Sequence, residues 1–262
     1  MPDDFRIITR GQGPDLVLLH GWGMHSGIWG RIADVLATEF RVNLVDLPGH
    51  GVNARIPLSR NLNDVAGSIM AELPSAIWVG WSLGGLVTLA AALEQPEKVQ
   101  KMVMVAATPS FSKRPDWDCG ADKQSQQDFS DGLENDFAGT LNQFCLKTFG
   151  ASWLEDSLHR LGVSSIIDNV PSKQVLHTGL YLLYHNNLLT RIRSCKVPSL
   201  FLGGSRDRTV RPGSLSQAAA LMPAASAVVI PGAGHAPFIS HEEKFLDITL
   251  GFLNARQGVA KV

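Results

Sequence analysis

A serine lies between two glycines at a spacing that suits nucleophilic chemistry. Ser82 is the centre of Gly80-Trp81-Ser82-Leu83-Gly84, which has the pattern G-x-S-x-G, and Gly85 follows it. The motif stands between a buried strand predicted over 76–81 and an Ala/Leu-rich helix predicted over 83–93, which is the context that a nucleophilic serine requires. A serine on so tight a turn has a strained backbone, and glycine at 80 and 84 removes side chains that would collide there. We therefore predict that Ser82 is a nucleophile, with the positive end of the helix directed at the developing oxyanion.

A serine hydroxyl needs a base, and the base in turn needs an acid to orient it. In sheet enzymes with this turn the order along the chain is serine, acid, histidine, each on a loop after a strand. His235 ends Pro231-Gly232-Ala233-Gly234-His235, directly after a strand predicted over 227–230, and Asp207 follows a strand predicted over 199–202. Ser82 and Asp207 are 125 residues apart, which leaves room for the inserted segment and a strand. Asp207 and His235 are 28 residues apart, which leaves room for one helix. We predict Asp207 as the acid and His235 as the base.

Other roles compete for these positions. His241 is a second candidate base, but it opens the last predicted helix, where capping or solvent exposure is expected. Asp207 could instead be a turn residue that pairs with Arg206 or Arg208. His20 could be catalytic, yet it stands where a strand ends and is expected to fix the geometry of the loop that follows.

Two backbone amides are expected to hold the oxyanion. One is the amide of Leu83, the residue after the nucleophile. The second is expected from the loop after the third strand, in His20-Gly21-Trp22-Gly23, with Trp22 as the donor. His50, in Asp46-Leu47-Pro48-Gly49-His50-Gly51, is interpreted as another loop-shaping residue.

The elements that position these residues form an alternating pattern. Apolar runs at 16–19, 42–45, 76–81, 102–106, 199–202 and 227–230 are predicted as strands, and helices are predicted at 28–40, 65–73, 83–93, 213–222 and 242–254. Strands that are apolar throughout and interleaved with helices predict an α/β fold with a mostly parallel sheet covered on both faces.

The alternation of predicted strands and helices stops between positions 111 and 190. This stretch predicts only short helices and holds nine of the 19 aromatic residues: Phe111, Trp117, Phe129, Phe137, Phe144, Phe149, Trp153, Tyr181 and Tyr184. We predict one core domain from 1–110 and 191–262, with 111–190 inserted as a helical cap. The aromatic rings could line a substrate pocket, form the small core of the cap, or do both.

Composition excludes several other classes of protein. The chain of 262 residues is 45% hydrophobic and 18% charged, which excludes a disordered protein, and its net charge of −1 gives no basis for nucleic-acid binding. The longest apolar stretch, 85–93, is about half of the roughly 18 residues that a membrane helix needs. No dinucleotide, Walker or zinc motif is present, so neither a cofactor nor a metal is expected. Three cysteines without a C-x-x-C pair and an acidic N-terminus lead us to expect a cytoplasmic protein.

The sequence resembles the α/β-hydrolase superfamily over nearly its whole length, and four segments carry the resemblance. Within that superfamily they are most similar to the pimeloyl-acyl carrier protein methyl ester carboxylesterases of bacterial biotin synthesis. The segments are Leu18-Leu19-His20-Gly21-Trp22-Gly23, Val45-Asp46-Leu47-Pro48-Gly49, Gly80-Trp81-Ser82-Leu83-Gly84-Gly85 and Gly234-His235-Ala236-Pro237-Phe238-Ile239-Ser240-His241.

The resemblance implies an α/β-hydrolase fold and hydrolysis of a methyl ester carried by an acyl carrier protein. It assigns the catalytic roles to Ser82, Asp207 and His235, and it implies that the acyl chain contacts Trp22, Ser82, Leu83, His235 and a cap segment, Gln143, Phe144, Cys145, Leu146 and Lys147. The cap holds ten acidic and six basic residues, so an acidic carrier would need a local basic cluster such as Lys147, His159, Arg160 and Lys173.

Three alternatives to that function remain open. The chain could be a broad short-chain esterase or lactonase that acts on small esters, a carbon–carbon bond hydrolase, or a ligand receptor without turnover. We expect a monomer, with no membrane or nucleic-acid partner.

Overall fold

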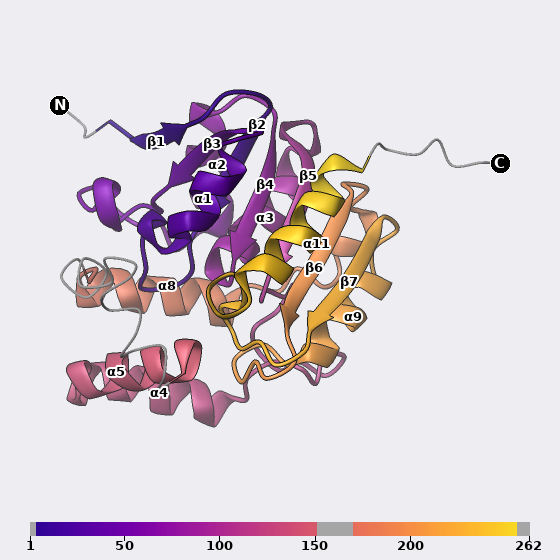
Figure 1. Ribbon diagram of the computed structural model, residues 1–262. Helices are drawn as coiled ribbons and strands as arrows, with labels where there is room; N and C mark the ends of the chain where they lie inside the picture. The colour runs from indigo at the N-terminus through magenta and orange to yellow at the C-terminus, as the bar shows by residue number, and fades with distance from the viewer. Residues whose placement is uncertain (1–3, 151–169, 256–262) are drawn as a thin grey trace.

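A seven-stranded sheet forms the centre of the protein. The computed structural model describes residues 4–150 and 170–255. The strands are β1 (Ile7–Arg10), β2 (Asp15–Leu19), β3 (Arg41–Val45), β4 (Ala76–Trp81), β5 (Val99–Val105), β6 (Ser199–Gly204) and β7 (Ala225–Ile230). Their order in the sheet is β1-β3-β2-β4-β5-β6-β7 (Figure 1). Only β1 runs antiparallel to its neighbour, which is β3, and the other pairs are parallel. The predicted α/β class and mostly parallel sheet are confirmed.

Helices cover both faces of this sheet. On β2, Leu16 and Leu18 join a buried cluster with α1 (Gly30–Leu36) and α11 (Glu242–Asn254). The alternate residues, Val17 and Leu19, join a second cluster with α2 (Leu62–Glu72), α3 (Leu83–Glu94) and α9 (Pro212–Ala220). Both sets are fully buried because helices pack on each face, which is why the strand sequence is apolar throughout rather than alternating.

Two features of the fold differ from the sequence predictions. The strand β1 was not expected, and the single helix predicted over 28–40 is wrong. A 3-10 turn at Ser26–Trp29 precedes α1 instead, and Gly30, the first residue of α1, has a φ of 38° that an uninterrupted helix does not allow. Further 3-10 turns lie at Gly51–Asn53, Pro96–Lys98 and Ile192–Ser194. The other predicted helices correspond to α2, α3, α9 and α11.

The segment between β5 and β6 contributes helices to one end of the sheet. They are α4 (Lys123–Asn135), α5 (Phe137–Phe149) and α8 (Lys173–His185), and a short helix, α10 (Pro237–Ser240), follows β7. Figure 1 shows α4 and α5 as a pair set apart from the sheet, with α8 between them and the core. α8 contacts both α3 and α4, so it joins the helical pair to the core. Among the described helices, none combines the length and apolar character that crossing a lipid bilayer demands.

Candidate active site

Ser82 occupies a strained turn between β4 and α3. Its φ of 53° and ψ of −114° lie outside the regions that non-glycine residues favour. The neighbouring glycines are required by close packing. A Cβ on Gly84 would lie 2.5 Å from the carbonyl oxygen of His20, and one on Gly80 would overlap the carbonyl of Gly84. The turn therefore holds the Ser82 hydroxyl at the carboxyl end of the central strand, as the motif predicts.

The side chains of Ser82, His235 and Asp207 form a hydrogen-bonded chain. His235 Nδ1 lies 2.8 Å from Asp207 Oδ2, and His235 Nε2 lies 3.1 Å from Ser82 Oγ. Because a carboxylate only accepts, Nδ1 carries the proton and Nε2 is free to accept the hydroxyl hydrogen of Ser82. The three side chains are buried, which lowers the local dielectric constant and strengthens the electrostatic interactions between them. This geometry suits removal of the serine proton by the imidazole.

The second oxygen of Asp207 is held by the backbone. Its Oδ1 accepts hydrogen bonds from the amides of Thr209 at 2.7 Å and Val210 at 2.9 Å, which leaves Oδ2 directed at His235. In the described part of the chain Asp207 pairs with His235, whereas Arg206 and Arg208 have exposed side chains and form no ion pair with it. The structure therefore does not support the alternative in which Asp207 is a turn residue paired with these arginines.

The loops around this chain are tied together by buried side chains. The indole of Trp81 donates to the carbonyl of His235 at 2.8 Å, and the same ring packs against Gly21. The indole of Trp22 donates to the carbonyl of Leu176 on α8, also at 2.8 Å. Trp81 therefore joins the loops that follow β2 and β7, while Trp22 fastens the first of them to α8.

The two predicted oxyanion donors are both available. Within the described residues, the backbone amides of Trp22 and Leu83 donate to no other protein atom. Leu83 is the first residue of α3, where backbone amides have no partner inside the helix. The loop that carries Trp22 follows β2, the second strand of the chain. The prediction that this loop follows the third strand is therefore wrong.

The remaining candidate histidines occupy other positions. The ring of His20 is fully buried and bonded to the backbone of two loops, and His50 donates through Nδ1 to the carbonyl of Pro48 at 2.9 Å. Burial, followed by the neighbouring His50, lowers the pKa of His20 to about 3, and burial lowers the pKa of His50 to about 4. His241 lies at the N-terminus of α11 and bonds Ser240 rather than Ser82. These positions agree with loop-shaping roles for His20 and His50.

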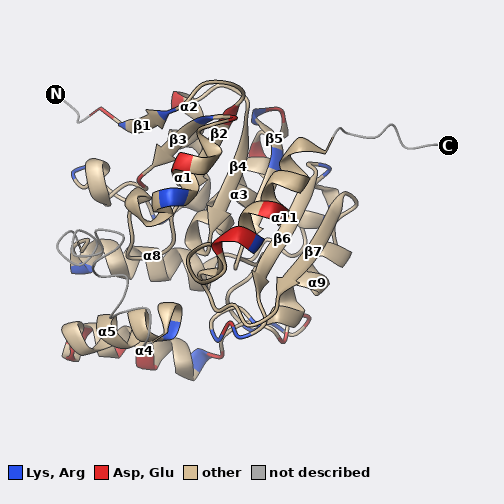
Figure 2. Cartoon of the chain, in the orientation of Figure 1, with Lys and Arg blue, Asp and Glu red and all other residues tan. Residues whose placement is uncertain are grey.

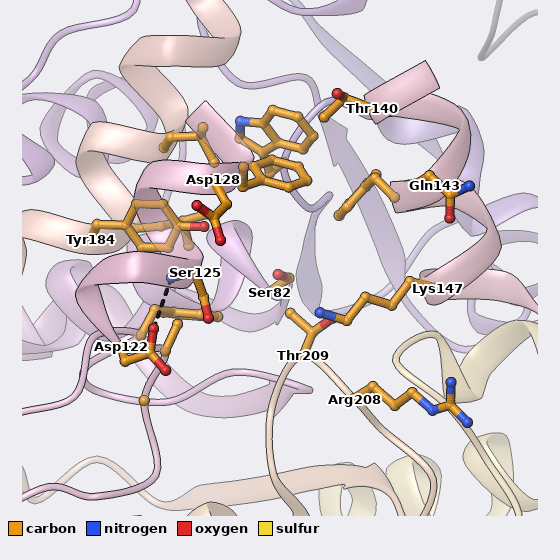
Figure 3. A pocket seen from close by; sticks show the side chains of 18 of the residues that line it. Ser82, Asp122, Ser125, Asp128, Thr140, Gln143, Lys147, Tyr184, Arg208 and Thr209 are labelled. Carbon is orange, nitrogen blue, oxygen red and sulfur yellow. Dashed lines mark hydrogen bonds between the residues drawn. The ribbon is translucent and has the colours of Figure 1, made fainter. Parts of the chain in front are cut away.

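A cavity of about 1040 Å³ opens above Ser82. Its wall combines residues of α4, α5 and α8 with the loop after β6, and Ser82 lies at its floor (Figure 3). One side carries Asp122 and Asp128, and the other carries Lys147 and Arg208. The mouth is therefore acidic on one side and basic on the other.

Four of the five predicted cap contacts lie on this wall. Gln143, Phe144, Leu146 and Lys147 line the cavity, whereas Cys145 packs against the buried cluster on the α1 and α11 face of the sheet. This difference follows from helix geometry, because five consecutive residues of α5 cannot all face one side. The segment as a whole thus faces the cavity, but Cys145 does not.

Four aromatic residues of the segment 111–190 line the cavity, and the others that the structure describes pack in several different environments. Phe111, Phe129, Phe144 and Tyr184 line the cavity. The rings of Phe129 and Phe144 meet Trp22 edge-on, with centroids 5.4 and 4.9 Å from it. Phe149 and Tyr181 pack elsewhere, against Trp81 and His185. Trp117 is buried, Phe137 lies under the ammonium of Lys173, and Trp153 falls outside the described residues.

The basic residues of the cavity differ from the expected cluster. Lys147 is on the wall, but Lys173 covers Phe137, and His159 and Arg160 fall outside the described residues. Lys147 is accompanied instead by Arg208 and Arg211 from the loop after β6. Figure 2 shows basic residues on the loops between α4 and the ends of β6 and β7. The sequence does not reveal that the loop after β6 contributes to the same cavity as α5. Its only sign of a basic site there is the three arginines within Arg206–Arg211.

Known proteins resemble this chain over almost its full length. The profile described as "Alpha/beta hydrolase family" matches residues 16–248. A protein of Xanthomonas campestris pv. campestris (strain B100) is 38% identical over 250 residues, which cover 95% of this chain and 98% of the relative. A protein of Stenotrophomonas maltophilia (strain K279a) is 40% identical over 239 residues, covering 91% of this chain and 92% of the relative. Both are named pimeloyl-[acyl-carrier protein] methyl ester esterase.

Solved structures share the fold at lower sequence identity. An esterase from Exiguobacterium antarcticum superposes with a TM-score of 0.83 at 19% identity, and the enol-lactonase of Burkholderia xenovorans LB400 with 0.82 at 19%. Each alignment covers 96% of both chains. At this identity the likeness extends to the arrangement of strands and helices only.

Proposed function

The chain belongs to the alpha/beta hydrolase family, and from that premise we propose that it is a serine carboxylesterase for the methyl ester of pimeloyl-acyl carrier protein. The observation that carries the proposal is the buried chain Ser82–His235–Asp207 at the floor of a cavity, in a protein 38–40% identical to esterases of that name over more than nine-tenths of its length. The reaction would complete an acyl chain for biotin synthesis.

The mechanism we propose uses protein groups alone. His235 Nε2 takes the proton of Ser82 Oγ as the oxygen attacks the ester carbonyl, and Asp207 stabilises the imidazolium that forms. The amides of Trp22 and Leu83 hold the oxyanion. Collapse of the tetrahedral intermediate breaks the bond to the methoxy group, which takes the proton from His235 and leaves as methanol.

Hydrolysis of the acyl-serine completes the cycle. Water gives one proton to His235 Nε2 and attacks the acyl carbonyl, and the second intermediate collapses to the free carboxylic acid with the proton returned to Ser82 Oγ. We propose that Trp22, Phe144 and Leu146, together with Gln143, contact the acyl chain along the cavity wall. Burial of methylenes there would contribute about 0.8 kcal/mol each.

A carrier outside the cavity fits the charge distribution at its mouth. Lys147, Arg208 and Arg211 have exposed side chains, and among the described residues none of them pairs with a carboxylate. An acidic carrier would be attracted to this side. Such contacts raise the rate of encounter and weaken as salt is added.

The organisation of the chain supports a self-contained enzyme. We propose residues 1–110 and 191–262 as the catalytic core and 111–190 as a cap that shapes the cavity. We also propose a monomer that acts in the cytoplasm, without a nucleic-acid partner.

The decisive experiment compares substrates. We expect kcat/KM for pimeloyl methyl ester on its carrier to exceed that for free short-chain methyl esters at low salt, and the preference to shrink at high salt. Equal values at both salt concentrations would favour a broad short-chain esterase or lactonase. An inactive wild-type protein in a p-nitrophenyl acetate assay would favour a receptor instead. Restored growth of a biotin-requiring strain that lacks its own esterase would support the assignment in cells.

A further inference from the structure

His20 connects two loops beside the proposed oxyanion site. It follows β2 directly, and its ring is fully buried. The ring Nε2 lies 2.9 Å from the backbone amide of Leu47, in the loop after β3, and Nδ1 lies 2.8 Å from the carbonyl oxygen of Gly21. Neither bond involves Ser82, so the proposed mechanism leaves this histidine without a role.

These two contacts define the tautomer of His20. A backbone amide can only donate, so Nε2 must be the unprotonated acceptor for Leu47. The neutral ring then carries its proton on Nδ1, which donates to the Gly21 oxygen. Burial and the nearby His50 lower the pKa of His20 to about 3, so the ring stays neutral in this tautomer near neutral pH.

The Gly21 carbonyl is part of the peptide group that supplies a proposed oxyanion donor. The oxygen of Gly21 and the N–H of Trp22 belong to one planar trans peptide and point in opposite directions. Fixing the oxygen therefore fixes the direction of the N–H. The amide of Met24 also approaches the Gly21 oxygen, at a longer 3.3 Å, so the His20 ring supplies the shorter of the two bonds.

We propose that His20 is a positioning residue that holds the Gly21–Trp22 peptide with the Trp22 N–H directed at the oxyanion. The inference rests on the proposed function, because it takes Trp22 as an oxyanion donor. The Nδ1–H bond to Gly21 is the part of His20 that matters for catalysis. The Nε2 bond to Leu47 matters for the stability of the loops.

Two amide variants, each of which replaces one ring nitrogen, separate these bonds. In His20→Asn the amide nitrogen can take the place of Nδ1 and donate to Gly21, but nothing reaches Leu47. In His20→Gln the amide oxygen can take the place of Nε2 and accept from Leu47, but the Gly21 oxygen loses its donor. Both variants exchange a ring for an amide, so both are expected to lose thermal stability.

Steady-state kinetics with p-nitrophenyl acetate provide the test. We expect kcat of His20→Gln to fall tenfold or more, toward the roughly 10²-fold that loss of one oxyanion donor costs, with KM within about threefold of wild type. We expect His20→Asn to keep kcat within about threefold. His50→Asn, in the adjacent buried ring, should be destabilised without a change in kcat. Equal kcat in the two His20 variants, or a greater loss in His20→Asn, would overturn the inference.

Two further measurements cover the remaining outcomes. If the variants do not fold, nitrogen NMR of the wild-type imidazoles still reports the tautomer, and a His20 proton on Nε2 would overturn the inference. The acetate ester does not depend on the natural acyl group, so an absent preference for the carrier-bound ester overturns the proposed substrate and leaves the role of His20 standing.

Discussion

Asp207 divides its two carboxylate oxygens between the backbone and His235. Oδ1 accepts from the amides of Thr209 and Val210, and Oδ2 lies 2.8 Å from His235 Nδ1. The carboxylate is therefore held in place by its own loop before it orients the imidazole. A carboxylate fixed in this way can hold His235 in the tautomer that accepts a proton from Ser82.

This arrangement predicts a graded response to substitution. Ser82→Ala and His235→Ala should each lower kcat by about 10⁶-fold, because either loss abolishes attack by the serine oxygen. Asp207→Ala should cost less, about 10⁴-fold, since the imidazole remains but loses its orientation. Steady-state kinetics with an activated ester measure all three, and circular dichroism checks that each variant is folded. Wild-type activity in Ser82→Ala or His235→Ala would contradict the proposed mechanism.

A matched pair of glycines tests the packing of the serine turn. Gly84 in α3 and Gly67 in α2 are both helical, and alanine is favoured over glycine in a helix by about 1 kcal/mol. A Cβ at Gly67 meets nothing within 4 Å, so Gly67→Ala should raise the free energy of unfolding. At Gly84 the Cβ would lie 2.5 Å from the His20 carbonyl oxygen. Gly84→Ala should therefore lower the free energy of unfolding, by about 1–3 kcal/mol, and reduce kcat.

Urea unfolding of the two variants measures the difference. Stabilisation by both substitutions would mean that α3 can move away from the loop after β2, and that the tight turn at Ser82 does not depend on glycine at 84.

Local sterics explain why the sequence alone was enough to predict the tight turn at Ser82. Ser82, its two glycines and the strand before them are adjacent in the chain, so the turn could be predicted without knowledge of the fold. Asp207 and His235 could be placed because each follows an apolar strand of the parallel sheet. By contrast, β1 was missed because it is an edge strand with three of its four residues exposed, and therefore shows no buried apolar run.

On the basic side of the cavity only Lys147 was predicted, and Arg208 and Arg211 were missed for a different reason. Lys147 and Arg208 are 61 positions apart in the chain, and the fold brings both to the wall of one cavity. The cluster predicted from the cap sequence contained Lys147, but it also contained Lys173, which packs on Phe137. The side of α5 that faces the cavity likewise depends on how the helix is rotated against the core, which is why Cys145 was included among the contacts.

Acid should destabilise the protein through its buried histidines. The folded-state pKa of His50 is about 4 and that of His20 about 3, both lowered by burial, whereas an unfolded histidine titrates near 6.5. Between pH 6.5 and about 4 the unfolded chain binds protons that the folded chain excludes. The free energy of unfolding should therefore fall with decreasing pH, by at most about 1.4 kcal/mol per pH unit for each histidine.

His50→Asn isolates one of these contributions. Its amide can still donate to the Pro48 carbonyl, but it does not titrate. Although less stable at pH 7, the variant should lose stability less steeply than wild type between pH 6.5 and 4. Urea titrations at several pH values give the slopes. Parallel slopes would contradict a lowered pKa at His50.

Charge reversal should separate carrier recognition from chemistry. Arg208→Glu with Arg211→Glu places two carboxylates on the basic side of the cavity mouth. We expect kcat/KM for the carrier-bound ester to fall tenfold or more at low salt, with little change for p-nitrophenyl acetate, because the loss is in encounter. Arg206→Glu is the control, since Arg206 is exposed on the same loop but does not line the cavity. An equal loss in the control, or no loss at low salt, would place the carrier elsewhere.

Phe144 should set how strongly the enzyme favours long acyl chains. Its ring lines the cavity and meets Trp22 edge-on at 4.9 Å, so it offers apolar surface above Ser82. Along a series of straight-chain methyl esters we expect kcat/KM to rise by up to about fourfold per methylene, which corresponds to 0.8 kcal/mol. Phe144→Ala should flatten this rise and leave the acetate ester within a few-fold of wild type.

A second phenylalanine in the same helix makes the comparison specific. Phe137 stands at the start of α5 under Lys173 and does not line the cavity, so Phe137→Ala removes a ring of equal size from the cap without changing the wall. We expect the dependence on chain length to be unchanged in this variant, even if it unfolds at a lower temperature. If both substitutions flatten the series equally, the cap acts through its overall stability. A series that stays steep in Phe144→Ala would instead move the acyl chain to another part of the wall, such as the side formed by Leu180 and Tyr184.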